Sequence, residues 1–413
     1  MLDNPLIKVK RPAPGEVFWK KEEILSDFWI SCISREASLL ARRDVLNGRG
    51  KFAITGDGKE IPQIAIARAF QKGDYRSGYY RDQTMMLYLG LTTIEDYFAQ
   101  LYADPVNDPF SGGRQMNNHF ATPFLDKDGN WTVHRERYNI SSGISSTGGQ
   151  MARGIGLAFA SKKYRESEVL RDSTPFSNNG NEVCFLTIGD ASTTEGVFWE
   201  TINAAGVLQI PLAVFVYDDG YGISVPIEYQ TTKGSISEAL RGFQAEPGSP
   251  GIDIYTVKGW DYPSLRQTIE EGVAKLRETF VPAVFHIQEL TQPQGHSTSG
   301  SHERYKSKER LDWEREYDCN RRFEKWILSN RFASLEELQE IKKKAANFAR
   351  DARDKAWKSY NDPNQRRTRT LLGIYQQLAV DCPNPEANRL HQQLRQSRNP
   401  LLYERSEEHT SEL

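Results

Sequence analysis

The chain has 413 residues, of which 38% are hydrophobic and 26% are charged, and its formal net charge is −2. These values predict an ordinary soluble protein with one large or two modest hydrophobic cores. A charge so close to neutral argues against binding to nucleic acid and to anionic membranes, because proteins that do so usually carry a basic face.

The N-terminal region predicts a helix over residues 16–46, with Trp19, Phe28 and Trp29 on its apolar side. The first residues lack the basic and apolar regions of a signal peptide, and no apolar run approaches membrane-spanning length. We therefore expect a cytoplasmic protein. The cysteines have no paired metal spacing, so neither disulfide bonds nor a zinc site is expected. They are Cys32, Cys184, Cys319 and Cys382.

Two loops follow this helix. Residues 48–60 predict a Gly-rich loop before a helix at residues 64–70, and residues 73–82 predict an aromatic and basic loop. The second loop contains the pair Tyr80-Arg81. A guanidinium group can contact phosphate with two nitrogen atoms, which makes the pair a candidate phosphate site. A Tyr-Arg pair on its own is more often a surface pair, so this prediction depends on the motifs further along the chain.

Residues 112–119 read Gly-Gly-Arg-Gln-Met-Asn-Asn-His and predict a loop. His119 is either bonded within this loop or placed at the mouth of an active site. Residues 141–147 then open a helix that carries a stripe of small residues, which lets another helix approach closely. Internal packing and a contact between subunits are both open interpretations of the stripe. It consists of Ala152, Gly156 and Ala160.

A strand-helix-strand unit comes next. The runs at residues 183–188 and 211–217 are short and β-rich, which is typical of buried parallel strands. Between them, Ser192-x-x-Glu195 has the form of a capping box, and apolar residues then recur at helical spacing. These apolar residues are Phe198, Ile202 and Ala205.

Each of the two strands ends in an acidic turn, with Asp190 after the first and Asp219 after the second. For either turn alone, the simplest interpretation is an acidic residue that ends a strand. Both strands of such a unit end at the same edge of the sheet, where ligands of open α/β sheets bind. The pair therefore predicts a site for a small divalent cation that also takes oxygen atoms from a substrate phosphate.

Residues 253–257 and 283–289 are two further candidate strands, separated by a predicted helix at residues 263–279. The loop after the second strand, residues 294–299, reads Gln-Gly-His-Ser-Thr-Ser. An isolated histidine in such a loop is usually only exposed. The position of His296 after the last core strand favours a catalytic or phosphate-contacting role.

The C-terminal part begins with a second capping box, Ser334-Leu-Glu-Glu337, and predicts a packed surface helix. Residues 361–404 are rich in Asn, Gln, Arg and Pro and predict a linker or the start of a following domain. Residues 405–413 resemble the in-frame translation of a sequencing-library adapter. We expect this tail to be non-native and the native carboxyl end to be missing.

Several of these segments resemble the alpha subunit of the thiamine-diphosphate-dependent decarboxylating (first) component of 2-oxo acid dehydrogenase complexes. The segment 189–226 resembles the family's Gly-Asp-Gly, helix, Asn-Asn-Gly-Tyr pattern, with Ala191 for a glycine and Asp218-Asp219 for the two asparagines. Residues 50–60, Tyr80-Arg81, residues 113–116, 142–144 and 295–299 match further motifs in the family's order, over roughly residues 20–360. The Gly-Arg-Gln-Met and His-Ser-Thr-Ser stretches are most similar to branched-chain members, although Asn117 replaces their proline.

The resemblance implies roles for individual residues. Asp190, the side chain of Asp219 and the backbone carbonyl of Tyr221 would hold Mg²⁺, and Ser146 or Thr147 would help to bind a monovalent cation such as K⁺. His296 and His119 would be catalytic. The implied cofactor-binding residues are Tyr80, Arg81, Ser142, Gly143, Ile144, Gly189, Ala191, Ser192 and His296.

Three departures from the family pattern concern charge. Asp219 keeps an oxygen ligand but adds a negative charge beside a diphosphate, and Tyr217 and Gln292 stand where many members have arginine. Fewer positive groups and one more negative group predict weaker diphosphate binding, unless a Lys or Arg from elsewhere compensates.

The resemblance implies an α/β fold with a doubly wound, mostly parallel sheet of the thiamine-diphosphate-binding type and helical N- and C-terminal extensions. We expect an N-terminal extension at residues 1–60, the cofactor domain at 61–330 and a C-terminal helix at 331–360, before the linker at 361–404 and the tail at 405–413.

The implied reaction is oxidative decarboxylation of a 2-oxo acid with acyl transfer to lipoamide, with thiamine diphosphate as the cofactor. A beta subunit or fused beta domain would supply the glutamate that contacts the pyrimidine ring, in a heterotetramer that works with a lipoyl-bearing acyltransferase. Two alternatives stay open at this point. They are a transketolase-like carboligase fragment and a non-catalytic assembly or regulatory subunit.

Overall fold

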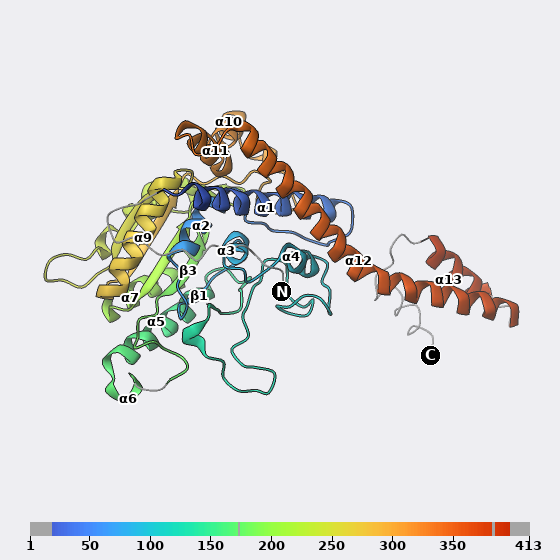
Figure 1. Cartoon of the computed structure of the whole chain (residues 1–413), viewed down its shortest axis with the longest axis horizontal. Coiled ribbons are helices and arrows are strands. Elements are labelled where there is room, and N and C mark those ends of the chain that lie inside the picture. Colours follow the sequence, from blue (N-terminus) through green and yellow to red (C-terminus); the bar gives the residue numbers. More distant parts are fainter. Residues whose placement is uncertain (1–18, 172–173, 382–384, 397–413) are drawn as a thin grey trace.

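The protein is described by a computed structural model that covers residues 19–171, 174–381 and 385–396. The expected features at residues 16–18, at Cys382 and in the tail at 405–413 lie outside these residues. Over the described part, one parallel sheet is flanked by helices, and a long helix projects from one side (Figure 1).

The sheet has six strands in the order β2-β1-β3-β4-β8-β7, and every neighbouring pair is parallel. The chain builds outward from β1 in one direction and from β3 in the other, so the order reverses between these two strands. This confirms the doubly wound α/β fold. The strands are β1 Tyr75–Ser77, β2 Asn139–Ile140, β3 Cys184–Gly189, β4 Leu212–Tyr217, β7 Asp253–Lys258 and β8 Ala283–Gln288.

Helices cover both faces of the sheet, and β4 contributes alternate side chains to each. Leu212, Val214 and Val216 pack with the helices α5 (Gln150–Glu166) and α7 (Gly196–Leu208). Ala213 and Phe215 pack with α2 (Glu60–Ala69) and α9 (Tyr262–Thr279). Because successive side chains of a strand point to opposite faces, a strand covered on both sides is apolar throughout. This explains why the run at 211–217 predicted β4 correctly.

The helices α1, α2, α7 and α9 agree with the expected segments, with shifts of a few residues at their ends, whereas α4, α6, α8, α10, α11 and α13 were not predicted. A small β5–β6 hairpin, Tyr221–Gly222 paired with Val225–Pro226, follows β4. The helices are α1 Lys21–Leu46, α2 Glu60–Ala69, α3 Gln83–Tyr88, α4 Ile94–Leu101, α5 Gln150–Glu166, α6 Glu168–Arg171, α7 Gly196–Leu208, α8 Ile236–Ala239, α9 Tyr262–Thr279, α10 Lys308–Glu316, α11 Cys319–Ser329, α12 Leu335–Asp381 and α13 Pro385–Gln396. None of the helices in the described ranges is long and apolar enough to span a membrane.

The N-terminal helix α1 belongs to the main hydrophobic core. Its Ile24 and Phe28 are fully buried in the same cluster as the α2 and α9 side chains, and α1 runs along α12. Phe28 packs edge-to-face on Phe323 of α11, with ring centroids 5.9 Å apart. The expected N-terminal helix is therefore present, but it is packed into the domain rather than appended to it.

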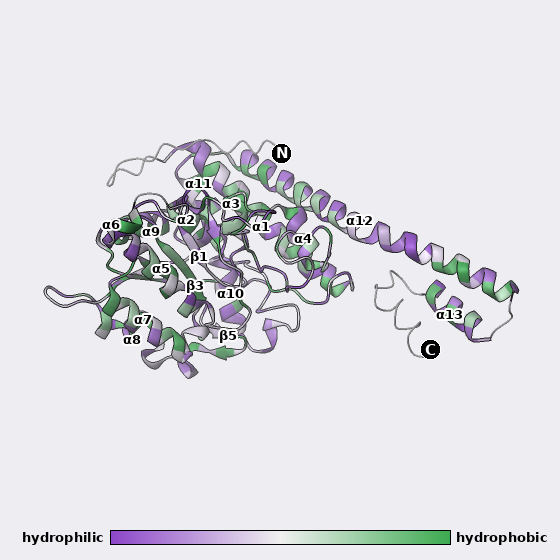
Figure 2. Ribbon diagram, turned by 90° about the horizontal axis from the view of Figure 1, so that it is seen from below, coloured by the Kyte–Doolittle hydropathy of each residue, from purple (hydrophilic) through white to green (hydrophobic). Residues whose placement is uncertain are grey.

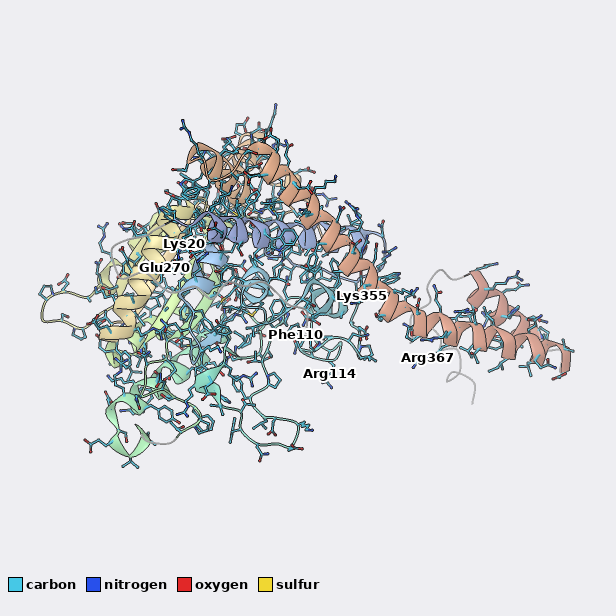
Figure 3. All side chains as sticks on the ribbon, in the orientation of Figure 1. Lys20, Phe110, Arg114, Glu270, Lys355 and Arg367 are labelled. Atoms are coloured by element: carbon cyan, nitrogen blue, oxygen red, sulfur yellow. The ribbon has the colours of Figure 1, made fainter. Side chains whose placement is uncertain are left out.

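The C-terminal helix is longer than the sequence predicted. The Ser334 capping box is confirmed, since Glu337 N donates to Ser334 Oγ (3.2 Å) and Ser334 N to Glu337 Oε2 (2.8 Å). The helix does not end at residue 360. It continues through Pro363 to Asp381, across much of the expected linker at 361–404. Its projecting part carries Arg367 (Figure 3) and stands away from the domain in the second view as well (Figure 2).

The physical reason for this extension lies in α13. Tyr375 of α12 packs with Ala387 and Leu394 of α13 in a small hydrophobic cluster, to which Leu371 and Leu372 of α12 also contribute. Most helical stability in proteins comes from the packing of such a face rather than from intrinsic propensity. This stretch was expected to be a linker or the start of a following domain, and its described part is helical because α12 and α13 pack on each other.

Candidate active site

The two acidic turns meet in one cavity. Asp190 follows β3 and Asp219 lies just after β4, and both side chains line a cavity of about 490 Å³ at the carboxyl edge of the sheet, next to the reversal in strand order. Such a position is where open α/β sheets bind ligands. The Gly220 N–H donates to Oδ2 of Asp190 at 3.0 Å, which joins the two turns directly. The sequence prediction that these residues lie together is confirmed.

The local fold explains this placement. Gly189 of β3 pairs with Tyr217 of β4, and Asp190 N donates to the Tyr217 carbonyl at 3.0 Å. After Asp190 the chain makes a 3₁₀ turn, Ala191–Thr194, before α7 begins at Gly196. The predicted capping box at Ser192 and Glu195 is therefore wrong, because Ser192 lies inside the turn and no side chain caps α7.

The charges around the two aspartates are unequal. Burial, followed by the charges of Asp219 and Asp218, raises the pKa of Asp190 well above its ordinary value. Burial alone would also raise the pKa of Asp219, but the ammonium group of Lys59 and its hydrogen bond lower it. Lys59 Nζ lies 2.8 Å from Asp219 Oδ2. The cavity therefore has a paired carboxylate beside one whose negative charge is uncompensated.

Asp218 does not line the cavity, although its side chain lies close enough to Asp190 to raise the pKa of that residue. Its Oδ2 lies 2.8 Å from Nε2 of His286 on β8, and Nδ1 of that ring lies 3.0 Å from Ser237 Oγ. Its Oδ1 accepts from Gly220 N at 2.9 Å. Asp218 therefore fixes the turn rather than lining the cavity.

Arg81 and His296 form another part of the cavity wall, together with Tyr80. Arg81 Nη1 donates to the Thr55 carbonyl (2.6 Å) and Nη2 to the His296 carbonyl (3.1 Å), so the arginine holds the His296 loop. Burial, with the nearby charges of Arg81 and Lys59, lowers the pKa of His296 to about 4. The ring is therefore neutral near pH 7 and has one nitrogen as donor and one as acceptor.

The turn at Asp219–Tyr221 is fastened by α10, a feature that sequence reasoning missed. Arg310 Nη2 donates to the Asp219 carbonyl at 2.7 Å, and Arg310 Nε lies 2.9 Å from Glu314 Oε1. The guanidinium also stands over the ring of Tyr221, 5.3 Å from its centroid, and Lys306 Nζ is 5.0 Å from the same ring. The predicted cofactor-binding residues Gly189, Ala191 and Ser192, and also Tyr221 and Thr147, line the cavity as well.

His119 and residues 142–144 do not line this cavity. The His119 ring is buried, with Nδ1 2.9 Å from the Met116 carbonyl and Nε2 2.7 Å from Ser145 Oγ. A Cβ on Gly143 would lie 3.0 Å from the His119 Cα, so the histidine packs under that loop. Arg114 of the preceding motif is exposed at the surface (Figure 3). The structure places His119 as a support of residues 142–147, and its role at the mouth of an active site stays a prediction.

The small-residue stripe of α5 faces outward. Ala152, Gly156 and Ala160 are all exposed, whereas Gly154 and Ala158 are buried. Internal packing of the stripe, one of the two open interpretations, is therefore wrong within this chain. A subunit contact at this face stays a prediction.

The cavity's donor set fits a small divalent cation. Two buried carboxylates face the same space, and the pKa of Asp190 is raised by its burial and by the charges of the neighbouring aspartates. Over the described ranges no three His, Cys, Asp or Glu side chains group as a metal site. A cation here would therefore also need backbone or ligand oxygen atoms, which suits hard ions such as Mg²⁺.

The chain is similar to known proteins over most of its length. Residues 33–364 match the family model described as dehydrogenase E1 component. A 2-oxoisovalerate dehydrogenase subunit alpha of Bacillus subtilis (strain 168) is 26% identical over 316 residues, 76% of this chain and 84% of that relative. The mitochondrial 2-oxoisovalerate dehydrogenase subunit alpha of Mus musculus is 24% identical over 81% of this chain and 68% of the relative. The pyruvate dehydrogenase E1 component subunit alpha of Rickettsia bellii (strain RML369-C) is 25% identical over 73% and 81%. Because the family model covers more than half of the sequence, the chain belongs to the dehydrogenase E1 component family.

Proposed function

We propose that this chain is the alpha subunit, or alpha half, of a thiamine-diphosphate-dependent 2-oxo acid dehydrogenase. It decarboxylates a 2-oxo acid oxidatively and passes the acyl group to lipoamide. Family membership and the names of the relatives support this reaction over a transketolase-like one. A branched-chain 2-oxo acid is the preferred substrate, in keeping with the 2-oxoisovalerate dehydrogenases among the relatives.

One observation carries the proposal: Asp190 and Asp219 line the same cavity as Arg81 and His296 at the carboxyl edge of the sheet. In this proposal Asp190, Asp219 and the Tyr221 carbonyl hold Mg²⁺. Arg81 and Tyr80 hold the diphosphate, which a guanidinium suits through its parallel N–H donors. Gly189, Ala191 and Ser192 supply the remaining wall.

Thiamine diphosphate, when bound, supplies a carbanion centre and an acceptor for the electron pair left by decarboxylation. The residues of this chain bind and orient. Asp190 and Asp219 hold the cation that neutralises the diphosphate, and Arg81 fixes the loop that carries His296. The neutral His296 ring offers a hydrogen-bond donor and an acceptor toward the cavity, and so it can hold or move a proton there.

Further parts of the proposal concern partners and location. A beta subunit or fused beta domain supplies the glutamate for the pyrimidine ring, in a heterotetramer that delivers acyl groups to a lipoyl-bearing acyltransferase. Residues 142–144 contact the pyrimidine half together with this partner, and Ser146 or Thr147 helps to bind K⁺. The cytoplasmic location expected from the sequence stays a prediction.

The direct test is an assay of the complex assembled from this chain and its beta partner. Branched-chain 2-oxo acids, pyruvate and other 2-oxo acids are supplied with Mg²⁺, thiamine diphosphate and a lipoyl acceptor. The expected result is turnover that is fastest with a branched-chain acid. An assembled complex that neither binds thiamine diphosphate nor turns over any 2-oxo acid would favour the non-catalytic alternative and reject this proposal.

A further inference from the structure

Lys59 is a buried ammonium group in the wall of the candidate active site. It is only 1% exposed, and it lines the same cavity as Asp190 and Asp219. Its Nζ lies 2.8 Å from Asp219 Oδ2, 3.0 Å from Gln292 Oε1 and 3.2 Å from the Thr291 carbonyl. An ammonium has three donors, so these three acceptors satisfy it fully. Lys59 therefore acts on protein groups rather than on a ligand.

The position of Lys59 is fixed by the start of α2. Lys59 N donates to the Gly56 carbonyl at 3.2 Å, and Gln63 N donates to the Lys59 carbonyl at 3.3 Å. The next residue, Glu60, is held by Arg35 through bonds of 2.6 and 2.9 Å. The backbone of Lys59 is therefore held in place by hydrogen bonds of its own and by the Glu60–Arg35 ion pair, and this fixes the point from which its ammonium group reaches Asp219.

The contact with Asp219 is one-sided. Lys59 binds Oδ2, whereas Oδ1 accepts only a long bond of 3.3 Å from Tyr221 N within its own turn. Removing one partner of a buried ion pair leaves an uncompensated charge, which is strongly unfavourable. Without Lys59, the carboxylate of Asp219 would stand unpaired beside Asp190. With Lys59 present, one carboxylate oxygen is occupied and the other remains available to a cation.

We propose that Lys59 is a positioning residue of the metal-diphosphate site, which neutralises the charge of Asp219 and holds it with Oδ1 free to bind the cation. This inference rests on the proposed function and deepens it. It identifies the compensating positive group that the sequence required from elsewhere in the chain. Asp219 and Lys59 therefore form one functional unit in which neither residue is replaceable alone.

The test is a double-mutant cycle in the complex of the full chain and its beta partner. The variants are Lys59→Gln, Asp219→Asn and the two combined, and the readout is Mg²⁺-dependent thiamine diphosphate binding by titration calorimetry, alongside thermal unfolding. Each single variant is expected to weaken binding at least about tenfold, because each leaves one buried charge unpaired. The double variant replaces the ion pair by two amides at the same net charge. It is expected to bind within about threefold of the wild type.

Lys72→Gln combined with Asp128→Asn is the matched control, since both residues are exposed and lie outside the cavity. Single variants that bind normally, or a double variant whose losses simply add, would overturn the inference and leave the proposed function intact. Binding that is insensitive to EDTA would also overturn it, because the ammonium would then replace the cation. If a single variant does not fold, the charge-balanced double variant decides alone. No binding by the wild type would reject the proposed function and this inference together.

Discussion

The backbone N–H of Gly220 donates to Oδ2 of Asp190 at 3.0 Å, and this bond connects the turn after β4 to the turn after β3. The Asp190 carboxylate thus has one oxygen engaged with the turn that carries Asp219. The two turns form a single structural unit at the sheet edge, so a change at Asp190 affects both ligands.

Replacing Asp190 by Ala should abolish cofactor binding in the assembled complex. The change removes a carboxylate ligand and the acceptor for Gly220 N, so the expected loss of Mg²⁺-dependent thiamine diphosphate affinity is about 100-fold or more. Calorimetric titration measures it, and Asp128→Ala in an exposed loop serves as the control. Unchanged affinity in the Asp190 variant would reject the metal assignment.

His296 should make stability dependent on pH below neutrality. Its pKa is lowered from 6.5 to about 4, so between these values the unfolded chain binds a proton that the folded chain does not. Stability is therefore fully present above pH 6.5 and falls as the pH is lowered toward 4. From about pH 7 to about pH 5, the wild type should lose about 2 kcal/mol more than His296→Gln. Urea unfolding at both pH values measures this, with His391→Gln on α13 as the control. An equal loss in wild type and variant would contradict the expectation.

Arg277 should stabilise the amino-terminal edge of the sheet, opposite the candidate active site. Its Nη1 and Nη2 atoms each lie 2.7 Å from an oxygen of Asp74, which is fully buried before β1. Replacing Arg277 by Met leaves this carboxylate unpaired and should cost about 3–5 kcal/mol of unfolding free energy.

The control for Arg277 is an exposed ion pair. Lys355 of α12 (Figure 3) lies 2.8 Å from Glu95 of α4, and their side chains are 66% and 37% exposed. Lys355→Met should cost less than about 1 kcal/mol in the same urea unfolding experiment. Similar losses in the two variants would show that burial does not determine the strength of the Arg277 pair.

Gly58 should tolerate no side chain. It has a φ of +82°, and a Cβ there would collide with the Thr291 carbonyl, one of the acceptors of Lys59. Gly248 has nearly the same φ, +81°, but nothing within 4 Å of its Cβ position. Gly248→Ala should therefore cost only the backbone strain, about 1 kcal/mol, and Gly58→Ala clearly more. Urea unfolding measures the free energy of unfolding of both variants. Equal losses would mean that the loop at residue 58 shifts to accommodate the Cβ atom.

The sequence predicted the central part of the fold well. The strands β3, β4, β7 and β8 and the helices α7 and α9 came from apolar runs and helical spacing, and the pairing of Asp190 with Asp219 followed from parallel topology alone. The strands β1 and β2 were missed. They have three and two residues, too few for a run to be recognised. They form because β1 pairs with β3 and β2 in turn pairs with β1.

Lys59 was missed for a different reason. A lysine in a Gly-rich loop has the composition of an exposed residue, and its partner Asp219 lies 160 residues away in the chain. A signal was nevertheless present, since an additional buried aspartate at 219 required a positive group. Only the tertiary fold identifies which lysine supplies it. The part of α12 beyond residue 360 was missed for the same reason. It is stabilised by contacts with α13, and the sequence alone does not show these contacts.

A row of aromatic rings crosses the sheet beneath α9. Phe185, Phe215, Phe285 and Tyr255 lie on four neighbouring strands and stack in succession, with centroids 5.6, 4.8 and 4.9 Å apart and interplanar angles of 18°, 13° and 12°. A one-residue slip of any strand would turn its ring to the opposite face and break the row. The stacked rings therefore fix the register between β3 and β4. In this way core packing determines the spacing between Asp190 and Asp219, which follow these two strands.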